Sequence, residues 1–195
     1  MSAVCSNLEL ITRICFLSIS MATKLYLIRH GETVENVAHI LQGQIDGNLS
    51  ERGIQQAKDA REALRDVAFD AIVCSDLKRC RDTAAILNEA HGLDINYTKL
   101  LRERDWGSIT GMVADGTRKI EIPEDAESMS ALTVRAKIFL NFILDTYPDK
   151  TVLAVSHGFF CRVVQAVYYG QTIKDVVPMT NTEVRILELD GTKRY

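Results

Sequence analysis

The stretch KLYLIRHGETVEN, Lys24 to Asn36, begins as a short apolar run and ends in an arginine, a histidine and a glycine. An apolar run of this length that stops at a glycine predicts a buried strand over 24–29. The stretch TVLAVSHG at 151–158 repeats the pattern of a short apolar strand followed by His-Gly. This repetition makes His30 and His157 candidates for one shared site.

Around these two stretches, strand patterns alternate with helix patterns. Ser50 is a suitable capping residue for a helix that the apolar spacing extends from 51 to about 67. Strands that alternate with helices predict an α/β domain, here a three-layer sandwich whose mostly parallel central sheet is flanked by helices. Further strands are expected at 71–74, 95–101 and 182–189, and further helices at 79–90, 128–147 and 159–169.

We expect residues 23–195 to form this domain, with a short, irregular cap segment at about 105–127. Residues 1–22 are set apart as an extension that is dispensable for the fold. Glu9 and Arg13 interrupt its apolar run, which argues against a membrane span, and a basic start typical of a secretory signal is missing. A disordered terminus, a weak targeting segment and an over-long gene start remain open explanations.

The composition is that of a soluble globular protein, with 195 residues, 47% hydrophobic and 25% charged. A net charge of -3 provides no global basic field, so neither nucleic acid nor a membrane surface is an expected partner. The five cysteines are scattered and odd in number, which favours a reducing, cytoplasmic setting over a disulfide framework. Organelle targeting by residues 1–22 stays open, and the sequence does not predict an oligomeric state.

The carboxyl ends of the strands are where ligands bind in open α/β sheets, so His30 and His157 are expected to meet at one cleft. The glycine after each histidine lets a ligand approach the backbone, and a nearby helix start favours an anion. Each histidine alone is equally compatible with a simple hydrogen-bonded strand end. The repetition of the pattern, with Arg29 adjacent, favours a shared anion site.

Residues after two other strands are candidates for binding phosphate and for donating a proton. Arg79 begins the helix after the strand at 71–74, where its guanidinium is expected to fork onto phosphate oxygens. Glu103 follows the strand at 95–101. A carboxylate beside a phosphate is repulsive unless it carries or donates a proton, so Glu103 is a candidate general acid for a leaving oxygen.

Taken together, these residues resemble the histidine phosphatase superfamily, also called the phosphoglycerate-mutase-like family. A lone Arg-His-Gly arises by chance in roughly one chain of this length in a hundred, whereas the ordered set does not. The resemblance extends from about Lys24 to Leu189. It rests on Arg29-His30-Gly31-Glu32-Thr33, Asn36, Gln42-Gly43, Asp46, Leu49-Ser50, Gly53, Gln56-Ala57, Ser75, Leu77, Arg79, Thr83-Ala84, Leu101, Glu103, Gly107, Gly111, Glu127-Ser128, Arg135, Ser156-His157-Gly158 and Asn181.

The resemblance implies that His30 is a nucleophile that attacks phosphorus and forms a phosphohistidine. To attack, its imidazole must be neutral, and the positive charges of Arg29 and Arg79 disfavour the imidazolium form. The same charges would neutralise the phosphoryl oxygens. Glu103 would protonate the departing alcohol and then draw a proton from the water that hydrolyses the phosphohistidine.

The resemblance also implies roles for residues around this centre. Asn36 would add a neutral donor to the phosphate, and His157 a further donor or cation. Gln42 and Gly43 lie where the body of the substrate passes, although Gln42 is equally compatible with a surface loop. Trp106 either walls the pocket or fills the edge of the core. Neither a metal nor a cofactor is implied.

The length of the cap segment distinguishes a phosphatase from a mutase. Only sixteen residues, MVADGTRKIEIPEDAE, stand between Gly111 and Ser128, where mutase-like members carry a long helical insertion. A mutase must keep water from its intermediate, so a short cap predicts a phosphomonoester hydrolase that acts on a small phosphorylated metabolite. The alternatives are a phosphoglycerate mutase, a phosphoprotein phosphatase and a member that only binds phosphorylated ligands. Arg118 and Lys119 would contact a second anionic group of the substrate or remain solvated.

Overall fold

Five strands form one sheet in the order β3-β2-β4-β1-β5. In the computed structural model, which describes residues 22–114, 116 and 119–195, strands β1 to β4 pair in parallel and β5 pairs antiparallel with β1. Almost all of the extension expected at 1–22, and Arg118 of the cap, lie outside the described residues. The strands are β1 (Thr23–Arg29), β2 (Ala71–Ser75), β3 (Ile95–Thr98), β4 (Thr151–Ser156) and β5 (Val184–Leu189).

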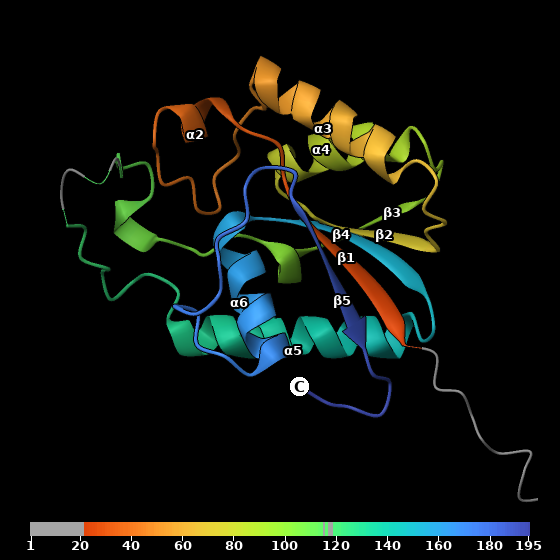
Figure 1. Cartoon of the computed structure of the whole chain (residues 1–195). Coiled ribbons are helices and arrows are strands. Elements are labelled where there is room, and N and C mark those ends of the chain that lie inside the picture. Colours follow the sequence, from red (N-terminus) through yellow and green to blue (C-terminus); the bar gives the residue numbers. More distant parts are fainter. Residues whose placement is uncertain (1–21, 115, 117–118) are drawn as a thin grey trace, which may run out of the picture.

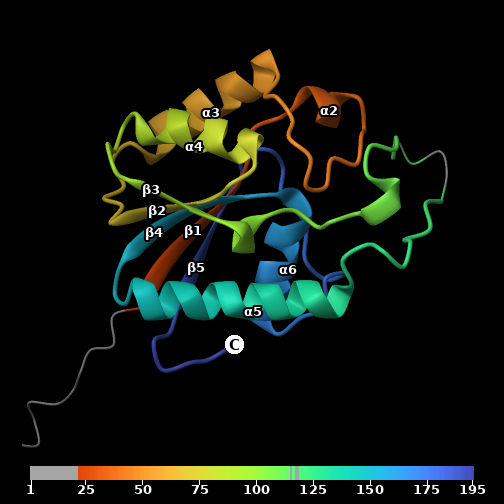
Figure 2. The same cartoon turned by 180° about the vertical axis from the view of Figure 1, so that it is seen from behind.

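Helices cover both faces of this sheet (Figures 1 and 2), which confirms the predicted three-layer α/β class. Helices α3 and α4 lie on one face and α5 and α6 on the other. The alternation along β1 places Leu25 and Leu27 in the core beneath α5 and α6, and Ile28 in the core beneath α3 and α4. No helix in the described part of the chain is long and apolar enough to cross a membrane. The helices are α2 (Val34–Val37), α3 (Glu51–Leu64), α4 (Lys78–Asn88), α5 (Met129–Thr146) and α6 (Gly158–Tyr169).

The sheet order brings the two His-Gly strands together. β1 and β4 are direct neighbours, and their register pairs Arg29 with Ser156. The next residue of each strand is therefore a histidine, His30 and His157, and the two leave the same edge of the sheet side by side. The expected meeting of the two histidines follows from this pairing.

Several element boundaries differ from expectation. α3 ends at Leu64, three residues early, and β3 stops at Thr98, where a 3-10 turn over Lys99–Leu101 replaces the end of the expected strand. β5 starts two residues late, because Thr182 adopts a φ of 57°, which a strand does not accommodate. The short helix α2 was not expected.

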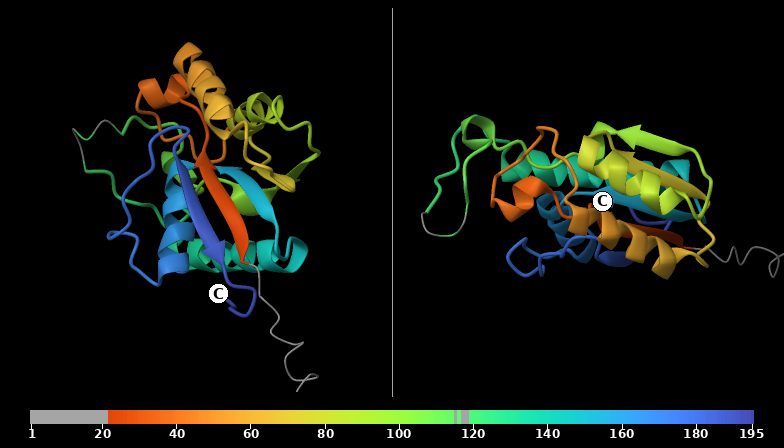
Figure 3. Two further views of the ribbon diagram at one scale, coloured as in Figure 1. Left: turned by 45° about the vertical axis from the view of Figure 1, so that its right-hand side comes forward. Right: turned by 90° about the horizontal axis from the view of Figure 1, so that it is seen from above.

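The cap segment is closed at its base by two hydrogen bonds, one between backbone groups and one from the backbone to a side chain. Glu127 N donates to Asp105 O (2.9 Å), and Ser108 N donates to the Asp125 carboxylate (2.9 Å). Its middle part, Gly111–Ala114, pairs with the chain that follows α2. Figure 3 shows α2 and the cap segment at the same end of the molecule, beyond the carboxyl ends of the parallel strands.

Candidate active site

A cavity of about 140 Å³ opens beyond the carboxyl ends of β1 and β2. The site residues predicted from the sequence line it, with the exception of His157, which lies directly behind it. Two apolar residues that the sequence did not indicate, Ile40 and Leu41, complete the wall with Trp106. The full lining is Arg29, His30, Asn36, Ile40, Leu41, Gln42, Gly43, Arg79, Glu103 and Trp106.

The hydrogen bonds of His30 fix its tautomer. Its Nδ1 lies 2.7 Å from Gly31 O, which can only accept, so Nδ1 carries the proton. Nε2 accepts from Arg79 Nε at 3.2 Å, and an arginine nitrogen can only donate. The Nε2 lone pair therefore points toward the Arg79 side of the cavity, as a nucleophile requires.

The same surroundings keep both histidines neutral. Burial lowers the pKa of His30 well below its ordinary value of 6.5, and the charges of Arg79 and Arg29 lower it further, against the opposing hydrogen bond to Gly31. Burial, then Arg79 and His30, lower the pKa of His157 in the same direction. A neutral imidazole at His30 is the form that can attack phosphorus.

The two neutral histidines predict a loss of stability in acid. Above pH 6.5 both the folded and the unfolded chain carry neutral histidine. Below pH 6.5 the two imidazoles are protonated in the unfolded chain but stay neutral in the folded chain. The free energy of unfolding therefore falls by up to about 1.4 kcal/mol for each histidine and each pH unit of acidification. Urea midpoints measured between about pH 7 and 5.5 test this, and His30→Ala should roughly halve the slope. A wild-type midpoint that stays constant over this range would contradict it.

His157 is fully buried, and its two ring nitrogens face other side chains rather than the cavity. Nδ1 accepts from Arg79 Nε (3.1 Å), so Nε2 carries the proton and donates to Ser75 Oγ (2.8 Å). The thiol of Cys80, which the sequence did not place at the site, lies 3.3 Å from Nε2. His157 orients Arg79 and does not itself line the cavity, and the contact with a phosphate expected of it stays a prediction.

Arg79 donates hydrogen bonds to the backbone of a loop. Its two terminal nitrogens donate to Ile45 O and Gly43 O, each at 2.8 Å, and its side chain is almost fully buried. Each terminal nitrogen carries a second N–H beyond the one on its carbonyl, so the expected fork onto phosphate oxygens stays a prediction. Further bonds hold this loop, because Asp46 accepts from Lys78 N and Gln44 donates to Glu103 O. Arg79 brings its positive charge and its Nε to the histidines.

Arg29 lines the cavity, and one of its nitrogens has no hydrogen-bond partner. Nη1 donates to Met179 O (2.7 Å), while Nε is buried and has no hydrogen-bond partner. Gly158 packs against this guanidinium, since a Cβ added at Gly158 would lie 3.1 Å from Arg29 Nε. Arg29 therefore brings the positive charge of its guanidinium to the cavity wall.

The Glu103 carboxylate occupies the helix start that was expected to favour a ligand anion. Oε1 accepts from Arg104 N (2.9 Å) and Phe160 N (3.1 Å), and Oε2 accepts from Phe159 N (3.2 Å). Phe159 and Phe160 belong to the first turn of α6, whose free N–H groups suit a carboxylate. Glu103 is thus fixed in the cavity wall.

Asn36 and Gln42 belong to one hydrogen-bonded network. Gln42 Oε1 accepts from Thr33 Oγ1 (2.9 Å) and Asn36 Nδ2 (3.3 Å). Gln42 is only 5% exposed, so the surface-loop alternative does not apply. Asn181 Nδ2 donates to His30 O (3.0 Å) and joins the network to the nucleophile's backbone.

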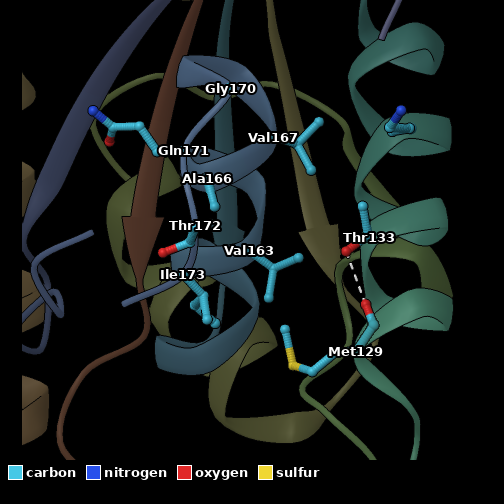
Figure 4. Close-up of a pocket in the computed structure, with 10 residues that line it drawn as sticks. Met129, Thr133, Val163, Ala166, Val167, Gly170, Gln171, Thr172 and Ile173 are labelled. Atoms are coloured by element: carbon cyan, nitrogen blue, oxygen red, sulfur yellow. Dashed lines mark hydrogen bonds between the residues drawn. The ribbon is translucent and has the colours of Figure 1, made fainter. Parts of the chain in front are cut away.

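A second cavity, of about 330 Å³, lies between α5 and α6 (Figure 4). Its labelled side chains include Met129 and Thr133 of α5 and Val163 and Val167 of α6. None of the predicted site residues lines it. It also reaches past the carboxyl end of α6, whereas Glu103 sits at the amino end, so the two cavities are separate.

Comparison with known proteins places this site in a family. The chain is 34% identical over 162 residues to a probable phosphoglycerate mutase GpmB of Erwinia tasmaniensis, with 75% of each sequence covered. It is 37% identical over 139 residues to an uncharacterized phosphatase PhoE of Bacillus subtilis, covering 70% of this chain and 72% of the relative.

Solved structures give the same result. Bacillus stearothermophilus YhfR superposes with a TM-score of 0.82 at 30% identity, over 89% of this chain and 95% of the other. A mycobacterial glucosyl-3-phosphoglycerate phosphatase superposes with a TM-score of 0.73 at 27% identity, over 87% and 99%. The family model of the histidine phosphatase superfamily (branch 1) matches residues 25–195. The resemblance found in the sequence is confirmed, and the chain belongs to the histidine phosphatase superfamily.

Proposed function

We propose that the protein is a phosphatase that hydrolyses small phosphomonoesters through a phosphohistidine at His30. The observation that carries this proposal is the neutral imidazole of His30, which lines a cavity together with Arg29 and Glu103 and whose unprotonated Nε2 accepts from Arg79 Nε. Membership of the superfamily and the phosphatase names of relatives support hydrolysis.

The proposed reaction has two steps. His30 Nε2 attacks phosphorus, the bond to the alcohol oxygen breaks, and that oxygen takes a proton from Glu103. Water then attacks the phosphohistidine, Glu103 takes a proton from this water, and orthophosphate leaves with His30 restored. The charges of Arg29 and Arg79 offset the negative charge on the phosphoryl oxygens in both steps. Asn36 is proposed as a neutral donor to the same oxygens, and Gln42 and Gly43 as contacts for the substrate body.

Phosphoglycerate mutase is the second candidate, because relatives with that name match over most of the chain. The cap segment argues for hydrolysis. Among its described residues the regular structure is limited to one 3-10 turn, Gly107–Ile109, so no helix there covers the cavity. Water then has access to a phosphohistidine, which favours hydrolysis over return of the phosphoryl group to a substrate.

We assign the activity to residues 23–195 and place it in the cytoplasm. The second assignment is supported by the three cysteines in the described part of the chain, Cys74, Cys80 and Cys161, which are free and buried. A reducing compartment maintains thiols in this state.

The test is phosphate release from a panel of phosphomonoesters in the presence of EDTA. We expect turnover without added metal, and no interconversion of 2- and 3-phosphoglycerate with or without a bisphosphoglycerate primer. Primer-dependent interconversion that outpaces phosphate release would establish the mutase instead. Binding of phosphopeptides without any turnover would show a protein that only recognises phosphorylated ligands.

A further inference from the structure

The catalytic cavity is too small for a whole substrate. Its volume is about 140 Å³, whereas small-molecule sites span roughly 300–1,000 Å³. One part of its wall is polar, with Arg29 and His30, and another part is apolar, with Ile40, Leu41 and Trp106. The phosphoryl group belongs at the polar part, so the organic part of a substrate must extend past the apolar wall.

A third cavity, formed by the cap segment, lies next to that apolar wall and is larger than the catalytic cavity. This cap pocket, of about 350 Å³, contains four apolar side chains, and Met112 and Val113 among them are 48% and 56% exposed. Apolar side chains that remain open to water beside a reaction centre are a feature of ligand-binding sites. The cap pocket is lined by Ile109, Met112, Val113, Lys119, Ile120 and Glu121.

Backbone pairing connects the two pockets. Ile40, in the catalytic cavity, forms an antiparallel bridge with Val113, in the cap pocket. Leu41 N donates to Met112 O at 2.9 Å, and Gly111 N donates to Leu41 O at 2.8 Å. Paired strands lie about 4.8 Å apart, so a single strand spacing separates the residues of the two pockets. An organic group that extends from the phosphoryl oxygen past Ile40 and Leu41 is therefore directed toward the cap pocket.

The described residues of the two pockets carry few charges. Arg29 and Arg79 are at the phosphoryl end, and in the cap pocket the charge of Lys119 is offset by the neighbouring Glu121. The described residues of the two pockets thus hold no excess of positive charge beyond that needed for one phosphoryl group.

We propose that the cap pocket binds an apolar organic group of the substrate, so that the preferred substrates are phosphomonoesters of apolar alcohols. This inference rests on the proposed phosphatase activity and adds the substrate class. The cavity between α5 and α6 also has apolar walls (Figure 4), but none of its residues lines the catalytic cavity, so it does not serve this purpose.

The test compares n-hexyl phosphate with ethyl phosphate, because the two alcohols are nearly equal as leaving groups and differ in apolar length. Each methylene that is fully buried raises affinity about fourfold. Partial burial of the four additional methylenes should therefore raise kcat/KM at least about tenfold for hexyl phosphate. 3-Phosphoglycerate, with its additional carboxylate, should be a poorer substrate than hexyl phosphate.

Two variants assign the effect to the cap pocket. Val113→Ser combined with Ile120→Ser should lower the ratio of kcat/KM for hexyl to ethyl phosphate to below about threefold. Val134→Ser is the matched control, because Val134 is 55% exposed, close to the 56% of Val113, but lies on α5. This control should retain the wild-type ratio.

The outcomes separate the two proposals. Wild-type protein that hydrolyses ethyl and hexyl phosphate equally well, or prefers 3-phosphoglycerate, overturns the apolar substrate class and leaves the phosphatase intact. A preference for hexyl phosphate that survives in the double variant overturns the cap pocket as its cause. Absence of hydrolysis for every ester overturns the proposed function itself.

Discussion

Replacing His30 with alanine is expected to reduce phosphate release by at least about 10⁴-fold, because the nucleophile of the first step is lost and no phosphohistidine can form for the second. The measurement is kcat/KM on one phosphomonoester, together with a thermal melt to show that the variant is folded. Acid quenching of a wild-type reaction should trap phosphate on the protein, and the variant should trap none.

His39→Asn is the matched control for this substitution. His39 follows α2 and does not line the catalytic cavity, and its φ of 55° suits asparagine. The control should retain wild-type activity. A His30→Ala protein that keeps more than about one per cent of its activity would show that another group attacks phosphorus.

Glu103→Gln is expected to lower kcat/KM, which reports the first step, by about 10³-fold on an alkyl phosphate, because an amide cannot protonate the departing alkoxide. On 4-nitrophenyl phosphate, whose leaving group needs no proton, the loss in the first step should be only about tenfold. The measurement is the ratio of the two losses. Equal losses on the two esters would show that Glu103 holds the structure of the site without donating a proton.

Glu124→Gln, an exposed position of the cap segment, serves as the control for removal of a carboxylate. It should leave both rates unchanged. The amide oxygen that Glu103→Gln introduces can still accept from the start of α6, so a thermal melt of that variant should show at most a modest loss of stability.

The sequence predicts the position of the reaction centre because that position depends on local patterns. A short apolar strand followed by His-Gly is visible at His30 and at His157, and topology places the ends of parallel strands at one edge. The strand order makes β1 and β4 direct neighbours. Local sequence patterns do not predict strand order.

What the sequence does not predict are contacts made by loops. The backbone carbonyls of Gly43 and Ile45 accept hydrogen bonds from Arg79. The direction of a backbone carbonyl cannot be predicted from the type of residue that carries it. Cys80 beside His157 follows from the rotation of α4, which periodicity fixes only approximately. The four residues of α2 are too few for a helical period, although Thr33 and Asn36 cap its start reciprocally.

The two hydrogen bonds that the loop accepts from Arg79 affect the release of product. A guanidinium held by Gly43 O and Ile45 O before any ligand arrives needs no ordering when an oxyanion binds. Free orthophosphate, the product, benefits from this rigidity as much as the ester does. The enzyme should therefore suffer competitive product inhibition, and the phosphate concentration of its surroundings would set how fast it works.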